Sequence, residues 1–189
     1  GFAALFLLLS GGVVAFSVLY LRQQELESNS KLIEAIAQII EEQTTRTFQT
    51  VDERLQIVEN ELARLNAVGG LDPQTARALL QRQLAELPFV RAMWIMNAGG
   101  QVIYESYGET RNSDASDRSY FQIYQGLAQT RFHISGPVRS RITGKWLIPA
   151  SRPLRTAEGK FNGVLVAAIE PLFFDKLWNS AHLTRGGAI

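Results

Sequence analysis

Two arginines of this sequence lie two positions apart in a segment that resembles a β-strand. A strand over 137–143 puts Arg139 and Arg141 on one face of a sheet, because successive side chains point to opposite faces. Arginine is poor core material, so both side chains are expected to be solvated, paired with carboxylates or holding an anion. A guanidinium group binds a carboxylate through two parallel hydrogen bonds. The sequence therefore leaves two interpretations open: a carboxylate-binding wall, and a solvated or salt-bridged edge.

Three aromatic residues are candidates to wall the same site: Trp94, Tyr104 and Trp146. Small-molecule pockets are mostly apolar and contain a few convergent polar groups, so aromatic rings beside arginines fit such a pocket. The alternative for each ring is plain packing in the core of the domain.

The patterns typical of catalysis and metal binding are missing from the sequence. There is no cysteine, and the two histidines, His133 and His182, lie too far apart in the chain for a helical metal-binding pair. Neither a Walker phosphate loop nor a G-x-S-x-G elbow occurs. We therefore expect no catalytic site, no metal and no cofactor in this piece. The net charge of +1 gives no electrostatic reason to expect nucleic acid as a partner.

The first 21 residues read as a transmembrane helix. Residues 2–21 carry no charge, and about 20 helical residues span about 30 Å, the thickness of the hydrocarbon core of a bilayer. The run is longer than the apolar region of a typical signal peptide. We expect a membrane span over 1–21, with a cleaved signal or a buried core helix as the alternatives.

A long helix is expected to follow over residues 22–68. The segment contains no proline or glycine, and Gly69 suits the end of a helix. Its apolar residues recur every three or four positions, which is typical of a helix with one buried face. This stripe indicates either parallel pairing with a second copy or packing against the helix's own domain. Its members are Phe48, Val51, Leu55, Val58, Leu62 and Leu65.

Residues 69–180 predict a small α/β (α+β) domain with a PAS-like central antiparallel sheet and helices on its faces. Asp72 and Pro73 mark the N-terminus of a helix. Asp117 is expected to cap another. In chain order, the expected elements are a helix over 73–86, strands over 89–96 and 101–105, a helix over 118–129, strands over 132–135, 137–143, 146–153 and 162–169, and a helix from residue 171.

Several motifs in this domain carry a family resemblance. They are the hairpin W-I-M-N-A-G-G-Q-V-I-Y, the segment D-R-S-Y-F at 117–121 and the segment R-I-T-G-K-W at 141–146. Over residues 22–180 the chain resembles the extracytoplasmic PAS-like sensors called Cache or PDC domains, and looks most like those of membrane-bound bacterial diguanylate cyclases and sensor histidine kinases. The resemblance implies a double-Cache receptor, with residues 181–189 as the start of a truncated second unit.

The resemblance also implies ligand contacts. In related sensors that bind carboxylates or amino acids, the arginine and the aromatic residue of the D-R-x-Y-F segment touch the ligand, which points here to Arg118 and Tyr120. Some relatives carry on the last strand an aspartate that binds the ligand's ammonium group. This sequence has Ala168 at that position, and a slip of two residues would bring in Glu170. The departure argues against an α-amino acid held in the usual way, and leaves a small anion or no small molecule.

The resemblance implies the sensing region of a receptor in the bacterial inner membrane, with its sensor domain on the periplasmic side. A small carboxylate, the lipid bilayer and a second copy of the chain are the expected partners. The full-length protein is expected to carry a cytoplasmic diguanylate cyclase or histidine kinase domain. The alternative function is a membrane-anchored protein-interaction module that binds no small molecule.

Overall fold

The computed structural model describes residues 2–69, 71–107, 113–126 and 130–183, with side chains described for 34–69, 71–107, 113–125 and 130–178. Its internal contacts divide the chain into two units, Gly1–Gln43 and Thr44–Ile189. The helix α1, Phe2–Ala67, contributes residues to both units, and it makes up the described part of the first.

A search of the described residues finds no helix that combines the length and the apolar character needed to cross a membrane. The predicted span over residues 1–21 lies outside the residues whose side chains are described. The predicted start of a second sensor unit, residues 181–189, likewise lies outside them. Both therefore stay predictions.

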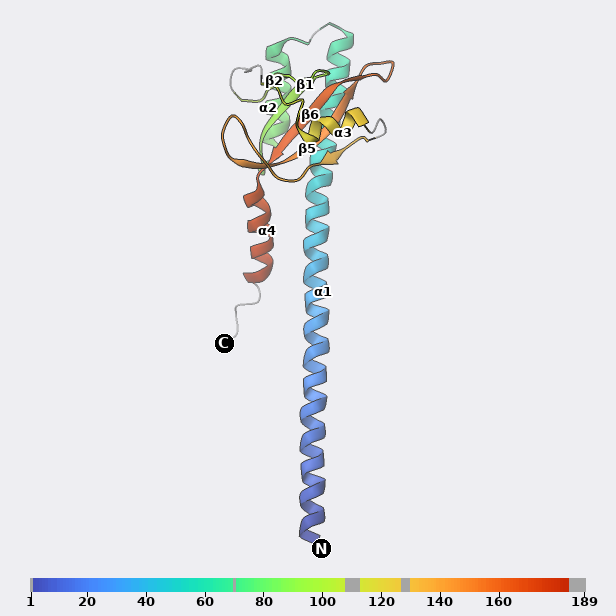
Figure 1. Ribbon diagram of the computed structural model, residues 1–189, viewed down its shortest axis with the longest axis vertical. Helices are drawn as coiled ribbons and strands as arrows, with labels where there is room; N and C mark the ends of the chain where they lie inside the picture. The colour runs from blue at the N-terminus through green and yellow to red at the C-terminus, as the bar shows by residue number, and fades with distance from the viewer. Residues whose placement is uncertain (1, 70, 108–112, 127–129, 184–189) are drawn as a thin grey trace. The chain divides into compact units, whose positions relative to one another are not determined.

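The second unit is built on one antiparallel sheet, with the strand order β2-β1-β6-β5-β3 and β4 paired with β5 (Figure 1). Three helices accompany the end of α1 in this unit. The elements after α1 are α2 (Pro73–Ala85), β1 (Val90–Asn97), β2 (Val102–Glu105), α3 (Ser119–Gly126), β3 (His133–Ile134), β4 (Val138–Arg139), β5 (Trp146–Arg155), β6 (Phe161–Ile169) and α4 (Pro171–Leu183). The antiparallel sheet and the long N-terminal helix confirm the predicted fold class.

The apolar stripe of α1 packs against one face of the sheet. Val51, Leu55 and Val58 have no exposed surface and lie in one cluster with α2 and the inner strands. Leu62 belongs to the same cluster, and Phe48 and Leu65 pack at its margin. Of the two interpretations of the stripe, packing within its own domain is therefore the observed one. Pairing with a second copy stays a prediction, and these buried residues are not available for it.

The second helix begins as its sequence predicts. The carboxylate of Asp72 accepts hydrogen bonds from the backbone N–H groups of Gln74, at 2.8 Å, and Thr75, at 3.0 Å, and Pro73 occupies the first turn. These bonds satisfy N–H groups that have no partner within the helix. The helix then buries Leu79 and Leu80 in the same cluster as α1.

The opposite face of the sheet is covered by α3. Its Tyr120, Phe121 and Tyr124 are buried against residues of β1, β2 and β6, in a second apolar cluster that includes Val164 and Val166. Figure 1 shows α3 lying across the strands. The sheet is thus sandwiched, and each strand residue faces either the α1 side or the α3 side.

The predicted strand over 137–143 is shorter in the structure. Only Val138 and Arg139 pair with β5, and the backbone N–H of Gly144 donates to the carbonyl of Ser140 at 2.9 Å. The Ser140 hydroxyl also accepts from the N–H groups of residues 142 and 143. These local bonds turn the chain and end the strand, because a serine side chain competes with strand pairing for backbone donors.

The burial of the α1 stripe can be tested with a pair of neighbouring substitutions. We expect Leu55→Ala to lower the free energy of unfolding by about 2–5 kcal/mol, because it removes buried methyl groups and leaves a cavity. Gln56→Ala, at an exposed position on the same helix, is expected to change it by less than about 0.5 kcal/mol. Urea denaturation measures both. Equal effects would contradict the observed packing of α1.

Candidate functional site

A cavity of about 110 Å³ lies on the α3 side of the sheet. Its walls come from β1 and β2, the segment before α3, the start of α3, and the β4–β5 turn. We call it the arginine cavity. Its lining residues are Arg91, Ala92, Trp94, Val102, Glu105, Ser113, Asp114, Ala115, Arg118, Tyr120, Val138, Arg139, Ser140, Arg141, Ile142, Thr143, Leu147 and Ala168.

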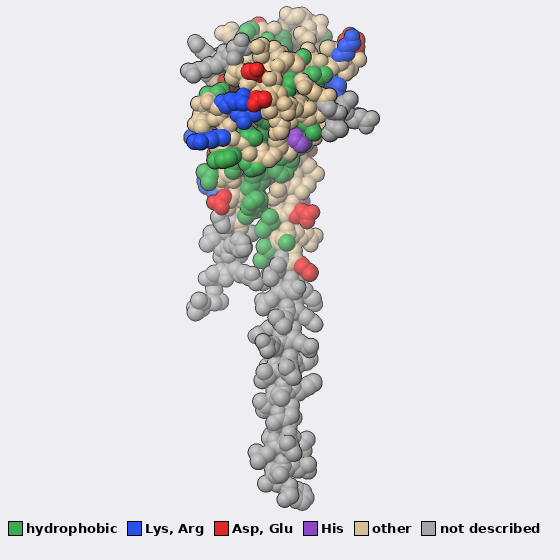
Figure 2. All heavy atoms as spheres, viewed as in Figure 1, with side chains coloured by type: hydrophobic (Ala, Val, Ile, Leu, Met, Phe, Trp, Pro, Cys, Tyr) green, Lys and Arg blue, Asp and Glu red, His purple; other side chains and the backbone are tan. Residues whose placement is uncertain are grey.

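Five of the seven predicted site residues meet in this cavity: Arg118, Tyr120, Arg139, Arg141 and Trp94. They come from three separate parts of the chain. Figure 2 shows Lys and Arg side chains gathered beside acidic ones on this face of the domain. The structure thus brings together the arginines of the turn and the two residues of the D-R-S-Y-F segment.

Tyr104 lies on the other face of the sheet. Met96 pairs with Val102, and continuing that register would place Tyr104 opposite Trp94; a β-bulge instead pairs Trp94 with Glu105. A bulge adds one residue to a strand and shifts the side chains beyond it to the opposite face. Tyr104 consequently packs against the α1-side cluster and lines a different cavity, of about 200 Å³.

Trp146 also lies outside the arginine cavity. It begins β5 directly opposite Arg139, and 60% of its surface is exposed. Its ring is therefore an exposed apolar group beside the turn, and the wall at this end of the cavity is formed by Leu147, which is buried.

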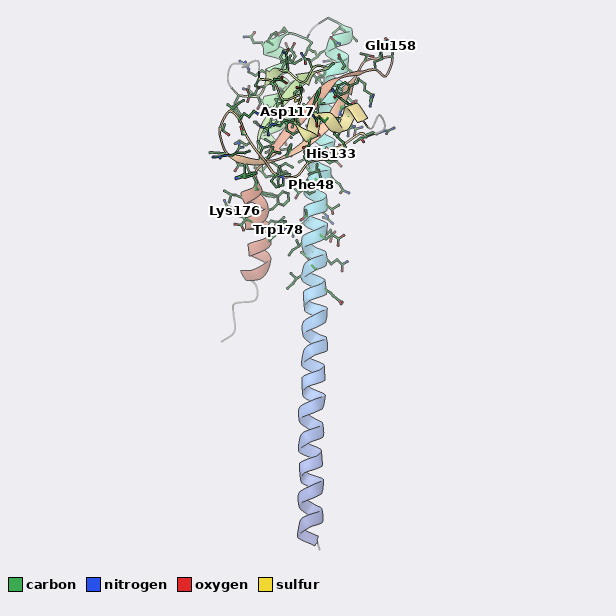
Figure 3. All side chains as sticks on the ribbon, viewed as in Figure 1. Phe48, Asp117, His133, Glu158, Lys176 and Trp178 are labelled. Atoms are coloured by element: carbon green, nitrogen blue, oxygen red, sulfur yellow. The ribbon has the colours of Figure 1, made fainter. Side chains whose placement is uncertain are left out.

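Arg141 is held by an ion pair with Asp117, which is labelled in Figure 3. Its guanidinium donates to both carboxylate oxygens, at 3.0 and 2.5 Å, and to the backbone carbonyl of Asp114 at 3.0 Å. The carboxylate of Asp117, which the sequence predicts as a helix cap, is thus used for this pair, and α3 begins at Ser119. The hydrogen bonds from Arg141 hold the pKa of Asp117 below its usual range.

A glycine brings the loop before α3 to this ion pair. Gly100 ends the β1–β2 turn with φ +85°, and an added Cβ would lie 2.5 Å from the Cα of Ser116. Ala115 donates its N–H to the carbonyl of Gly100 at 2.9 Å. Only glycine allows this close approach, which fixes the position of the Asp114 carbonyl that Arg141 binds.

Arg118 and Arg139 are the cations of the cavity that carry no carboxylate partner among the described residues. One terminal nitrogen of Arg118 donates to the carbonyl of Arg139 at 3.2 Å, and the Nε of Arg139 donates to the carbonyl of Gly144 at 2.7 Å. The remaining N–H groups of both have no hydrogen-bond partner in the described part of the chain and are available to an anion.

Tyr120 adds a hydroxyl to the same wall. Tyr120 is 6% exposed, and its ring meets Trp94 edge to face, with 6.1 Å between ring centroids. Burial raises the pKa of Tyr120, and the charges of Arg118 and Arg141 act in the opposite direction. Among the described residues no group hydrogen bonds to its hydroxyl. A neutral hydroxyl beside a free guanidinium is a suitable donor pair for a carboxylate.

Three charged lining residues were not predicted from the sequence: Arg91, Glu105 and Asp114. Arg91 lies at a bulge in β1 and pairs with Glu170 at 3.3 Å, and Glu105 ends β2. Burial raises the pKa of Glu105, while the charge of Arg77 lowers it. A charged residue inside the apolar run F-V-R-A-M-W-I-M was the signal that could have identified Arg91.

The two candidate residues at the end of the last strand, Ala168 and Glu170, have different surroundings in the structure. Ala168 lines the cavity, pairs with Ala92 across β1 and β6, and is 2% exposed. Glu170, the alternative at this position, is engaged by Arg91. The methyl group of Ala168 cannot bind an ammonium group, so this wall of the cavity is apolar.

Comparison with known proteins assigns the chain to a family. The family model described as Cache domain matches residues 19–188. The chain therefore belongs to the Cache domain family, and it is a sensor domain and not an enzyme. This confirms both the predicted resemblance and the predicted absence of catalysis. A comparison with curated proteins finds no match.

Solved structures of receptor domains share this fold. The extracellular domain of rpHK1S-Z16, a protein assigned as a histidine kinase, is 31% identical, with a TM-score of 0.65 over 72% of this chain and 55% of that one. The domain of the Campylobacter jejuni chemoreceptor Tlp3 with L-valine is 16% identical, with a TM-score of 0.58, over 79% and 65% of the two chains. The Pseudomonas aeruginosa chemoreceptor PctC with GABA is 19% identical, with a TM-score of 0.54, over 71% and 63%. The chain spans little more than half of the first of these domains.

The Arg141–Asp117 pair predicts a specific titration. In the folded chain we expect Asp117 to titrate below the usual value of about 3.9, and Arg141→Gln to raise its pKa because the donors are lost. The pair's contribution to stability is present above the unfolded pKa and is lost as the pH falls through the lowered folded pKa. NMR of the carboxyl carbon measures this. Arg131→Gln, an exposed control outside the cavity, should leave Asp117 unchanged; an unchanged Asp117 in Arg141→Gln would contradict the assignment.

Proposed function

We propose that this chain is the ligand-sensing region of a bacterial transmembrane receptor, and that the arginine cavity binds a small carboxylate. One observation carries the proposal: Arg118 and Tyr120 converge in a single cavity with hydrogen-bond donors that the described protein groups leave unused. An anion that enters the cavity would accept hydrogen bonds from these donors directly. Membership of a sensor family supports the same conclusion.

The lining contains four arginines and two acids, Glu105 and Asp114, and two of the arginines favour a negative ligand beside them. Arg141 is balanced by Asp117, and Arg91 by Glu170, whereas Arg118 and Arg139 have no acid within ion-pair distance among the described residues. A carboxylate placed between Arg118 and Tyr120 would receive charge-assisted hydrogen bonds, which are stronger than neutral ones. The Arg141–Asp117 ion pair holds the turn in place. Arg118 and Arg139, which have no acid partner in the described part of the chain, contribute the affinity for the anion.

The size of the cavity limits the ligand. A water molecule needs about 10–15 Å³ of such space, so a volume of about 110 Å³ holds about eight non-hydrogen atoms. The relatives solved with L-valine and with GABA bind ligands of about this size. The wall at Ala168 is apolar: it favours a short aliphatic chain on the carboxylate and has no acceptor for an ammonium group, unlike the part of the lining that Glu105 forms.

The receptor we propose is anchored in the inner membrane by residues 1–21. Residues 22–68 form its signalling helix, 69–180 its membrane-distal Cache unit in the periplasm, and 181–189 the start of a second unit; two copies of the chain pair. The similarity to rpHK1S-Z16 supports a histidine kinase as the output domain, in preference to a diguanylate cyclase. The downstream reading frame of the gene distinguishes these two outputs.

A thermal-shift panel tests the ligand class with matched compounds. Butyrate and 4-aminobutyrate differ by one ammonium group, as do isovalerate and L-valine. We expect at least one carboxylate without an ammonium group to raise the Tm, since a ligand at 100 times its Kd stabilises the folded chain by about 2.7 kcal/mol. Stabilisation by the amino-bearing members alone would contradict the apolar role of Ala168. No stabiliser at all, together with a co-purifying protein, would favour an interaction module.

Two substitutions test the binding residues. We expect Arg118→Ala and Tyr120→Phe to weaken binding of the best compound of the panel by about 10- to 100-fold and about 5-fold, because they remove a charged and a neutral hydrogen-bond donor. Isothermal titration calorimetry measures the affinities. The exposed Arg131→Ala is the control and should bind as the parent does. Parent-like affinity in Arg118→Ala would rule out the proposed carboxylate contact.

A further inference from the structure

A continuous set of polar contacts crosses the sheet from α3 to α1. We infer that Tyr124, Ser151 and Arg152 are positioning residues that couple the arginine cavity to α1. The inference rests on the proposed function for what enters the cavity. The contacts themselves join α3 and α1 whether or not the cavity is filled.

The crossing point is a pair of consecutive residues on β5. Ser151 pairs with Val166, which belongs to the α3-side cluster, and Arg152 pairs with Leu165, which belongs to the α1-side cluster. Successive strand residues point to opposite faces, so the two side chains leave the same stretch of backbone in opposite directions. A displacement of β5 at this point therefore reaches both faces of the sheet.

On the α1 side, one guanidinium group binds two acids of the helix. Arg152 is 7% exposed; its Nε donates to Glu59 at 2.9 Å, and a terminal nitrogen donates to Asp52. The two acids are seven residues apart, which is two helical turns. A buried cation that loses its partners is costly, so this clamp favours one rotation and one height of α1 on the sheet.

On the α3 side, the same strand is bound by a tyrosine. The hydroxyl of Tyr124 donates to the backbone carbonyl of Ser151 at 2.6 Å and lies 3.0 Å from its Oγ, which donates in turn to the carbonyl of His133. Burial raises the pKa of Tyr124 to about 12; Ser151 and Arg152 oppose the rise, and the acids of α1 add to it.

The cavity is one helical turn from this tyrosine. Tyr120 lines the cavity and precedes Tyr124 by four residues on α3, an eight-residue helix, so both lie on one face of a short rigid element. A ligand that draws Tyr120 and Arg118 inward moves Tyr124 with them. The Tyr124–Ser151 bond passes the displacement to β5, and Arg152 passes it to α1. The ligand shifts α1 only by the difference in its affinity for the two arrangements.

Hydrogen exchange on the chain without any added compound tests this coupling. We expect Tyr124→Phe to speed the exchange of α1 amides in 51–62 by about 5-fold, as the loss of one hydrogen bond would. The double substitution Asp52→Asn with Glu59→Gln should speed exchange in 119–126 in the same way. In the variant that carries all three substitutions, exchange should be only slightly faster than in the more affected of the two variants, because the effects of coupled residues are not additive.

Glu61→Gln is the matched control, since Glu61 is an acid of the same helix whose ion pair with Arg64 is exposed. It should leave exchange in 119–126 at the parent rate. Parent-like α1 exchange in Tyr124→Phe, or fully additive effects, would overturn the coupling. An equal increase in the exchange rate of α2 amides would indicate a general loss of stability, and would overturn the coupling as well. Because no ligand is used, these outcomes are independent of whether the cavity binds a carboxylate.

Discussion

The burial of both faces of one antiparallel sheet determines the rest of this domain. From Gly163 to Ile169 every residue of β6 is buried, and its side chains contribute in turn to the α1-side and α3-side clusters. The buried residues of the inner strands have almost no contact with solvent, so each polar group on them needs a partner within the protein. Arg152 finds its partners on α1, and Ser151 finds its partner on α3. The same constraint creates the functional asymmetry: α1 and α2 close one face, while α3 is short and leaves part of the other face open as the arginine cavity.

The arginines of the cavity divide into two roles because of their partners. Arg141 and Arg91 are paired with acids and hold the β4–β5 turn and the end of β6, respectively. Arg118 and Arg139 donate to backbone carbonyls and keep further donors unused by the described residues. Of the two interpretations that the sequence left open, the salt-bridged one is observed for Arg141, and carboxylate binding by Arg139 stays a prediction. In physical terms, the pairing supplies rigidity, and a rigid array of unused donors is what allows a small anion to be bound without a large ordering cost.

Local signals predicted most of the fold, and non-local contacts account for what they missed. Asp72 and Pro73 mark the start of α2, and the motif at 117–121 identified two cavity residues through the family resemblance. Nothing in the sequence marks the bulge that turns Tyr104 away from the cavity, because the bulge depends on the register between β1 and β2. The partners of Arg152 lie about 100 residues upstream, so no spacing rule could have found them. Asp117 was predicted as a cap because a cap is a local role, whereas its ion pair requires the folded turn.

The central claim is that an anion binds between Arg118 and Tyr120 on the open face of the sheet. A crystal structure of the chain soaked with the carboxylate that stabilises it most is the direct measurement. We expect density for the carboxylate within hydrogen-bond distance of the guanidinium of Arg118 and the hydroxyl of Tyr120, with the aliphatic part against Ala168. Density in the cavity beside Tyr104, or an arginine cavity that stays empty under saturating ligand, would contradict it.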